Sequence, residues 1–385
     1  MKKVLIGILF IFLMFPITVL GKEKETKYIP NAESGILIDV DSGTVLYEKN
    51  PNKKLAEASL TKMMVELIFM EKLEQGKIKL NDKIKVSENA ASFGGSQIYL
   101  EPNEEMTIED LFKGLSVASA NDATVAIAET ISGSEEEFVK LMNKKAKELG
   151  LNNTVFKNAT GLDAEGHYST AKDLSILSKE LLKHEKILEY SSIYEDYLRE
   201  DTKNKFWLVN TNKLIKTYEG ADGLKTGFTD AAGYSIAATA KRNGLRLLAI
   251  VLKEKDNKTR NQETTKLLDY GFQNYKVNIL KTKGSVVDTV TLDKADVENI
   301  DLVLKEDAKV LEKNIEKNKE YVTELKLNKI KLPVKKGDIV GKVLIKYDGK
   351  EISSADVTVK QDIDKISFIG LYLRNIKEAL TGNIV

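Results

Sequence analysis

Residues 56–64 read Ala-Glu-Ala-Ser-Leu-Thr-Lys-Met-Met, and this stretch decides both the fold and the chemistry of the chain. Ser59 and Lys62 are three positions apart, so on a helix they share one face and can interact. A serine hydroxyl is a poor nucleophile until a base takes its proton, and a lysine that is desolvated or near other cations can be that base. The residues from Met63 to Met70 are almost all apolar, which predicts a buried helix with the Ser/Lys pair at its first turn.

The composition narrows the class of protein. The 385 residues suggest two domains, and 59 basic against 58 acidic residues argue against a nucleic-acid partner. Cysteine is absent, which excludes disulfides, thiolate metal sites and a cysteine nucleophile. His167 and His184 are expected to be solvated or locally hydrogen-bonded, and we expect no metal site. A Ser-His-Asp triad is not excluded by count, but lysine is the better candidate base.

The N-terminal residues 1–21 have the pattern of a secretory signal peptide. Lys2 and Lys3 precede an apolar run, and a charged segment follows it. An uncleaved membrane anchor is the alternative interpretation. Both interpretations predict that the chain is exported.

Residues 28–275 show a hairpin first, helices in the middle and strands at the end. The last two strands, residues 234–240 and 245–252, are joined through Asn243-Gly244, which is a strong hairpin signal. We therefore predict one α/β (α+β) catalytic domain whose first and last strands share a sheet.

After about Lys276 the pattern of apolar residues in the sequence changes. Short segments with alternating apolar residues predict a small C-terminal all-β domain, a β-sandwich over residues 276–363. Residues 364–385 place Ile366, Ile369 and Leu373 on one helical stripe, with charged residues mostly opposite. This segment is too short and too charged to span a bilayer, so we expect an amphipathic helix that lies on a membrane surface. A terminal helix packed on the β domain is the alternative.

A second motif, Ser119-Ala120-Asn121, is expected in a turn between two apolar helices. Ser119 could relay a proton between a lysine and a leaving group. Asn121 could accept a hydrogen bond from a lysine and donate one to a substrate carbonyl. The alternative is that these residues only cap the next helix.

A third motif, Lys225-Thr226-Gly227, lies before the late strands. Gly227 would let an extended substrate lie close along the strand, and Thr226 offers a hydroxyl to a substrate carboxylate. Lys225 supplies a positive charge near that carboxylate, and near Lys62 it would lower the pKa of the candidate base. A glycine-rich turn without catalytic function is the alternative.

The three motifs, in this order, make the sequence resemble the low-molecular-mass penicillin-binding proteins, which are serine-type D-alanyl-D-alanine carboxypeptidases. Residues 95–102, 158–163 and 168–173 also resemble this family, and the resemblance covers nearly the whole chain. It implies a β-lactamase/transpeptidase-like catalytic domain and no metal or organic cofactor. It also implies a protein at the outer face of the cytoplasmic membrane.

The resemblance further implies a mechanism. Ser59 attacks the carbonyl between the two D-alanines of a peptidoglycan stem peptide, and Lys62 takes its proton. The backbone N–H groups of Ser59 and Phe228 form the oxyanion hole. The terminal D-alanine leaves, protonated through Ser119 or Lys62, and water hydrolyses the acyl-enzyme. Penicillin mimics the dipeptide and acylates Ser59.

Two positions depart from the pattern of some relatives. Thr211 stands where they have arginine, so binding of the substrate carboxylate is expected to depend on Thr226, Lys225 and Arg260. Phe228 stands where some have histidine, but only its backbone is needed. A β-lactamase, a D-Ala endopeptidase and a β-lactam or peptidoglycan sensor without turnover share the motifs and are the alternative functions.

Overall fold

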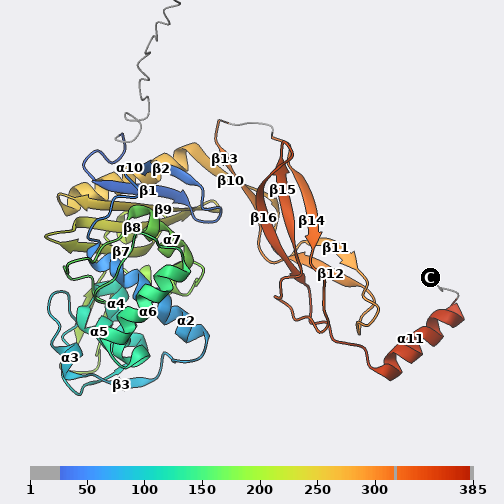
Figure 1. Ribbon diagram of the computed structural model, residues 1–385, viewed down its shortest axis with the longest axis horizontal. Coiled ribbons are helices and arrows are strands. Elements are labelled where there is room, and N and C mark those ends of the chain that lie inside the picture. Colours follow the sequence, from blue (N-terminus) through green and yellow to red (C-terminus); the bar gives the residue numbers. More distant parts are fainter. Residues whose placement is uncertain (1–26, 316–318, 382–385) are drawn as a thin grey trace, which may run out of the picture.

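The computed structural model describes residues 27–315 and 319–381 of the chain, and the predicted signal peptide, residues 1–21, lies outside them. Figure 1 shows a large mixed body, a smaller body of strands beside it and a helix at the C-terminal end. Within the described ranges, no helix is both long enough and apolar enough to cross a membrane.

One antiparallel sheet organises the large body, with the strand order β2-β1-β9-β8-β7. The first strand pairs with the last one, and Ile36 lies opposite Ile250. Asn243 and Gly244 both have positive φ, as a tight hairpin turn requires. The strands are β1 (Ser34–Asp39), β2 (Val45–Lys49), β7 (Ala221–Thr229), β8 (Gly233–Arg242) and β9 (Leu245–Glu254).

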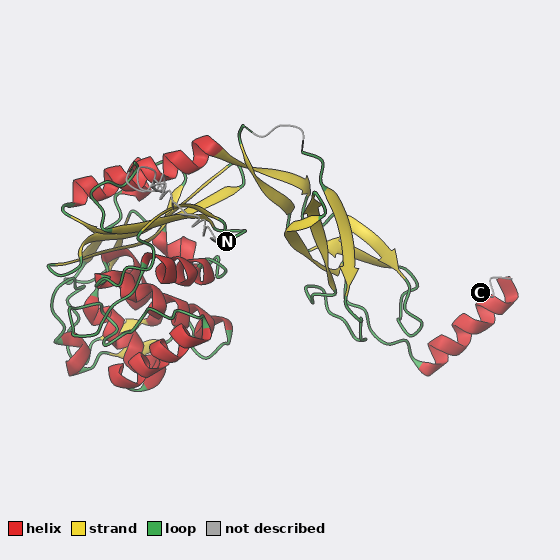
Figure 2. Ribbon diagram, turned by 45° about the horizontal axis from the view of Figure 1, so that its top comes forward, coloured by secondary structure: helices red, strands yellow, loops and turns green. Residues whose placement is uncertain are grey.

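Helices cover both faces of this sheet (Figure 2). On one face lies α10 (Asn257–Asn274), whose Leu267 and Leu268 share a core with Leu37 and Leu247 of the sheet. The opposite face carries the larger core, built on α2 (Lys62–Glu74). The helices that form this layer with α2 are α3 (Glu88–Ala91), α4 (Ile108–Ala118), α5 (Asn121–Ser132), α6 (Glu135–Glu148), α7 (Ala171–Leu181) and α8 (Ile187–Ser191). The short helix α9 (Leu214–Thr217) instead packs in the core of α10 through Leu214.

The central helix α2 is buried all round, as its sequence predicts. Every residue from Met63 to Met70 is buried, and the Phe69 ring stacks on Phe112 of α4 with centroids 4.0 Å apart. Two small two-stranded sheets complete the large body: β3 (Lys83–Lys85) with β4 (Glu105–Thr107), and β5 (Glu195–Leu198) with β6 (Phe206–Val209).

The smaller body is all-β, and the predicted fold class is confirmed. Side chains from both of its sheets, such as Val310 and Val357, share one hydrophobic core. Its strands are β10 (Tyr275–Lys281) paired with β13 (Ala308–Lys313), and the sheet β11-β12-β16-β15-β14, made of β11 (Val286–Val290), β12 (Ile300–Leu304), β16 (Lys350–Val359), β15 (Gly341–Tyr347) and β14 (Val322–Leu327).

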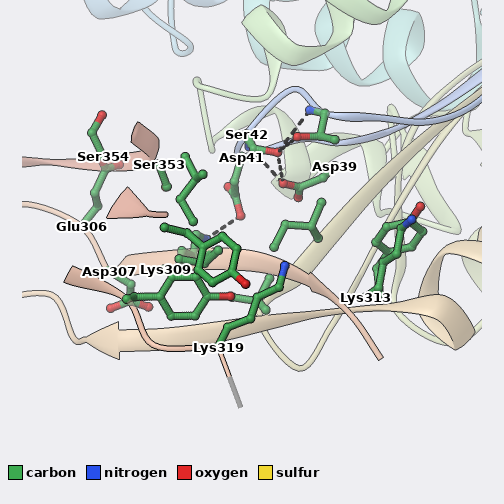
Figure 3. Close-up of a pocket in the computed structure, with 18 residues that line it drawn as sticks. Asp39, Asp41, Ser42, Glu306, Asp307, Lys309, Lys313, Lys319, Ser353 and Ser354 are labelled. Carbon is green, nitrogen blue, oxygen red and sulfur yellow. Dashed lines mark hydrogen bonds and ion pairs between the residues drawn. The ribbon is translucent and has the colours of Figure 1, made fainter. Parts of the chain in front are cut away.

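The two bodies meet beside the β1–β2 turn. Lys309 of β13 forms an ion pair with Asp41, with its Nζ 2.5 Å from Oδ2. A cavity of about 410 Å³ lies at this junction, lined from the first body by Asp39 and Ser42 and from the second by Tyr321 and others (Figure 3). The contact places β13 against the large body on the side of the β1–β2 turn.

The terminal helix α11 (Phe368–Thr381) extends away from the β domain (Figures 1 and 2). Arg374 ties it back, since its Nη2 donates to the Ala295 carbonyl at 2.8 Å. Large apolar side chains along the helix stay exposed, with Phe368 at 86% and Leu373 at 59%. The helix therefore presents an apolar surface that the β domain does not cover.

Candidate active site

Ser59 lies in a tight turn ahead of α2 rather than on the α-helix itself, which corrects the prediction. Residues Ala58–Thr61 form a 3-10 turn, and α2 begins at Lys62. In 3-10 geometry, side chains at positions i and i+3 eclipse, so the spacing of the motif still brings the pair together. Lys62 Nζ donates to Ser59 Oγ at 3.1 Å. Ser59 is the one residue of the turn that is not buried.

Two distant glycines hold this turn. Ala58 has a positive φ of 50°, a strained conformation for a residue with a Cβ. A Cβ added at Gly161 would lie 2.0 Å from the Ala58 carbonyl oxygen, and one at Gly227 would lie 3.0 Å from Ser59 N. The glycine of the third motif thus makes room for the backbone of the 3-10 turn that carries Ser59.

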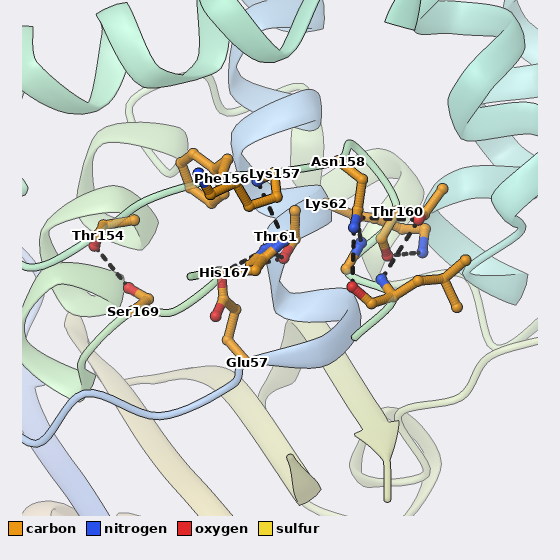
Figure 4. A network of polar contacts seen from close by, with 12 residues as sticks. Glu57, Thr61, Lys62, Thr154, Phe156, Lys157, Asn158, Thr160, His167 and Ser169 are labelled. Carbon is orange, nitrogen blue, oxygen red and sulfur yellow. Dashed lines mark hydrogen bonds and ion pairs between the residues drawn. The ribbon is translucent and has the colours of Figure 1, made fainter. Parts of the chain in front are cut away.

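The Lys62 ammonium is enclosed and fully hydrogen-bonded. The residue has no exposed surface, and besides Ser59 Oγ its Nζ donates to Asn121 Oδ1 at 2.7 Å and to the Thr160 carbonyl at 2.6 Å. Figure 4 shows Lys62 reaching the loop that carries Thr160. Burial, followed by the nearby positive charge of Lys225, holds the pKa of Lys62 well below its ordinary value. Lys62 is therefore suited to accept a proton.

The second motif joins α4 to α5 at the same site. Ser119 ends α4 in the left-handed region with φ 61°, and Asn121 is the first residue of α5. The Asn121 side chain accepts from Lys62 and donates through Nδ2 to the Gly94 carbonyl at 2.7 Å. Among the described residues, the buried Ser119 Oγ has no hydrogen-bond partner, which leaves it available to a substrate.

The third motif lies on β7, the edge strand of the sheet. Lys225 is buried beside Lys62, and burial lowers its pKa to about 8. Thr226 Oγ1 donates to Thr211 Oγ1 at 2.8 Å, so the threonine at the departing position belongs to the site. Phe228 is half exposed and its ring packs on Tyr234, with centroids 4.3 Å apart.

Arg260 lies at the first turn of α10, near Lys225. Its positive charge lowers the pKa of Lys225, after the larger effects of burial and of Glu66. The guanidinium itself is buried and donates to Asn257 and Asn261, and burial lowers its pKa to about 10. The structure thus brings all nine predicted residues to one region, although the contacts of Arg260 are to its own helix.

The sequence did not predict the contacts of His167 that hold the 3-10 turn in place, which we call the His167 brace. His167 is buried, and its Nε2 lies 2.9 Å from Thr61 Oγ1 and 3.0 Å from Glu57 Oε1 (Figure 4). Its Nδ1 accepts from the Lys157 N–H at 3.3 Å, so Nε2 carries the proton in the neutral ring. Glu57 and Thr61 flank Ser59, so this histidine is buried and bonded to a distant segment, rather than solvated or locally hydrogen-bonded as the sequence suggested, and it fixes the turn.

The loop that supplies the Thr160 carbonyl is a second missed element. Asn158 Oδ1 accepts from the Gly161 N–H at 2.7 Å, and Asn158 Nδ2 donates to the Leu162 carbonyl at 2.9 Å. Thr229 at the end of β7 donates to Asp163 at 2.6 Å and closes this loop against the edge strand. Residues 158–163 resemble the family in sequence, but nothing in their own sequence predicts the contact with Lys62.

A serine hydroxyl against a buried lysine, next to the open edge of an antiparallel sheet, is the arrangement of a serine hydrolase. Residues 22–256 match the family model for D-alanyl-D-alanine carboxypeptidase, peptidase S11, and residues 275–365 match the C-terminal domain of penicillin-binding protein 5. The chain belongs to the peptidase S11 family of D-alanyl-D-alanine carboxypeptidases.

Individual relatives agree with this membership. The D-alanyl-D-alanine carboxypeptidase DacF of Bacillus subtilis is 47% identical over 98% of this chain and 97% of its own. DacC of Escherichia coli is 35% identical over 94% and 92%. The crystal structure of penicillin-binding protein 5 from Haemophilus influenzae superposes with a TM-score of 0.68, at 32% identity, over 87% of this chain and 98% of that one. The chain is therefore a D-alanyl-D-alanine carboxypeptidase, which confirms the predicted activity.

Gly161→Ala should disable the site by moving the 3-10 turn that carries Ser59. The added Cβ would overlap the Ala58 carbonyl, and a shift of about 1 Å at a catalytic group costs about 100-fold in rate. We expect D-alanine release from a diacyl-Lys-D-Ala-D-Ala peptide to fall by about that factor. Gly150→Ala is the matched control, because Gly150 also has a positive φ but nothing lies within 4 Å of its added Cβ. Equal losses in both variants would contradict the packing argument.

Proposed function

We propose that Ser59 is the nucleophile and Lys62 the general base of this carboxypeptidase. The observation that carries the proposal is the 3.1 Å contact between Lys62 Nζ and Ser59 Oγ in a pocket where Lys62 is fully buried. The Ser59 proton passes to neutral Lys62 while Oγ forms a bond to the carbonyl carbon between the two D-alanines. The peptide C–N bond then breaks, and the leaving amine of D-alanine takes a proton from Ser119 or Lys62.

The proposed oxyanion hole consists of the Ser59 and Phe228 backbone N–H groups. Its support is the close packing of the nucleophile turn on β7 at Gly227, which places the two backbone segments side by side. Donors fixed in this way stabilise the negative charge of the tetrahedral intermediate without reorganising. The open edge of β7 would hold the stem peptide in an extended conformation, as a strand added to the sheet.

The proposed carboxylate subsite lies beside this hole. The Thr226 and Thr211 hydroxyls already form a pair, and one of them can turn to donate to the terminal carboxylate. Lys225 and Arg260 supply positive charge to this subsite. Asn121, which keeps one amide N–H beyond its bond to Gly94, would donate to the substrate carbonyl.

We further propose that β-lactams acylate Ser59. A solved relative, penicillin-binding protein D2 from Listeria monocytogenes in the ampicillin-bound form, is 34% identical to this chain over 63% of its length, with a TM-score of 0.57. Because penicillin resembles the D-Ala-D-Ala dipeptide, the attack that cleaves the substrate would open the lactam ring and leave the antibiotic on Oγ.

Ser59→Ala should abolish both reactions. We expect no release of D-alanine above background and no covalent penicillin labelling, since the atom that forms the acyl bond is gone. Ser192→Ala serves as the control, because Ser192 is exposed and bonds only the Leu188 carbonyl of its own helical region. Release that survives in the Ser59 variant would refute the assignment. Labelling without release in the wild type would instead indicate a sensor or an endopeptidase.

The pH dependence should report on Lys225. Its pKa of about 8 lies below the ordinary lysine value, so the ammonium is present below pH 8 and is lost above it. We expect kcat/KM for D-alanine release to fall above about pH 8, mainly through KM. In Lys225→Arg this fall should disappear, because a guanidinium stays charged to much higher pH. An unchanged fall in the arginine variant would mean that another group titrates.

The membrane association of this chain is also a proposal. We propose that residues 28–275 are the catalytic domain, residues 276–363 the β domain, and residues 364–385 the segment that binds the outer face of the cytoplasmic membrane. The support is the row of exposed apolar side chains on α11, whose polar side is partly basic in the sequence.

Deletion of residues 364–385 should release the enzyme from the membrane fraction without changing its activity. The same release is expected from the full chain with Leu373→Asp, because one charge on the apolar side opposes insertion. Ile315→Asp is the matched control, since Ile315 is 84% exposed but lies outside the helix. Fractionation of each variant from cells would test the proposal. It is wrong if the deleted form stays with the membrane.

A further inference from the structure

A buried carboxylate lies beneath the catalytic lysines and has no place in the mechanism so far. Glu66 is one helical turn after Lys62 on α2 and is only 1% exposed. Among the described residues, its Oε1 has no hydrogen-bond partner. An acidic side chain is rarely buried in this state unless its charge is compensated, because desolvation is costly. Its compensation therefore has to come from its neighbours.

The neighbours of Glu66 are the catalytic groups themselves. Lys225 of β7 and Lys62 of its own helix act on it electrostatically, and Ser116 approaches it from α4. Neither lysine meets Glu66 in a direct ion pair among the described contacts. The Lys62 Nζ contacts Ser59, Asn121 and Thr160 instead, and Lys225 donates to the Thr226 carbonyl at 3.4 Å. The three charges thus share one enclosed space of low dielectric, where they interact strongly.

No other carboxylate near the lysines is equally free. Asp122 of α5 also acts on Lys62, but its oxygens are occupied by the Ile98, Leu100 and Ala123 N–H groups. On the far side of Lys225 lies Arg260, which is positive and works in the opposite sense. Glu66 is the first carboxylate to act on each lysine.

We propose that Glu66 is a positioning residue of this active site, the internal counter-charge shared by Lys62 and Lys225. Its carboxylate keeps Lys225 protonated for the substrate carboxylate while Lys62 is neutral. When Lys62 takes the Ser59 proton, the same carboxylate stabilises the new ammonium. This inference rests on the proposed roles of the two lysines and adds the group that sets how they divide the positive charge.

Glu66→Gln tests the proposal, because it removes the charge and keeps the shape. Loss of the negative charge lowers the pKa of both lysines, so Lys62 becomes neutral at lower pH and Lys225 loses its proton at lower pH. The basic limb of the kcat/KM profile for D-alanine release lies above the pKa of Glu66, which burial raises to about 7, so this limb should move to lower pH, on the order of one unit. The acidic limb should move in the same direction only where it overlaps the pH range in which Glu66 is charged. A profile that superimposes on that of the wild type would overturn the proposal.

Two further variants make the test independent of folding defects in Glu66→Gln. Ser116 Oγ has no hydrogen-bond partner among the described residues, so it can turn toward Glu66 and favour the charged carboxylate. Ser116→Ala should therefore raise the pKa of Glu66 above its value of about 7 and move the profile in the same direction by less. Glu71→Gln is the matched control, because Glu71 is on the same helix but pairs with Lys145 of α6 at 2.8 Å. Its profile should match the wild type, and a shift as large as that of Glu66→Gln would refute a specific role.

The outcome separates this proposal from the one that it rests on. If the basic limb survives in Lys225→Arg, the assignment of Lys225 fails, whatever Glu66 does. If that limb disappears but neither Glu66→Gln nor Ser116→Ala moves the profile, only the counter-charge proposal is wrong. Circular dichroism and thermal unfolding of each variant would show whether a lost activity reflects a lost fold.

Discussion

The structure depends on the complete burial of one lysine side chain. An ammonium in the interior of a protein must be fully hydrogen-bonded or lose its proton, and Lys62 has both options available. Three acceptors from three separate segments surround its Nζ, which are the Ser59 hydroxyl, the Asn121 amide and the Thr160 carbonyl. To bring these together, the chain must place the start of α2, the α4–α5 junction and the 158–163 loop at one point.

This requirement explains why α2 is apolar on every side. A helix whose first turn lies inside the domain has neighbours all round, and its residues from Met63 to Met70 are accordingly buried. The sheet below provides the remaining boundary, because β7 lies at its edge and carries Lys225 into the same interior. Ser59, Lys62 and Lys225 thus lie where the two layers of the domain meet, beside the edge strand of the sheet.

The sequence was sufficient for much of this arrangement, and the reason is that its motifs are local. Three signals can be read within a few residues of sequence. They are the spacing of Ser59 and Lys62, the Asn243-Gly244 turn and the alternating pattern of the strands. What could not be predicted depends on contacts across the fold. The buried setting of Glu66, the brace of His167 against Glu57, and the need for glycine at position 161 appear only when distant segments pack. The strands β10 and β13 were not predicted either, although Tyr275, Val277 and Ile279 alternate with polar residues in β10.

The position of Ser59 and the basicity of Lys62 have separate physical origins. Ser59 is placed by backbone, through the strained Ala58, the two glycines that admit the turn and the His167 brace. The basicity of Lys62 is set by burial and by the surrounding charges, which come mainly from Lys225 and Glu66. Because backbone packing and buried charge are largely independent, a substitution in one set can change geometry while leaving the pKa values in place, and the reverse also holds. A lysine base therefore does not require a third catalytic side chain that orients it. It needs an enclosed space whose net charge is controlled, and the buried Glu66 is the group that we propose for this control.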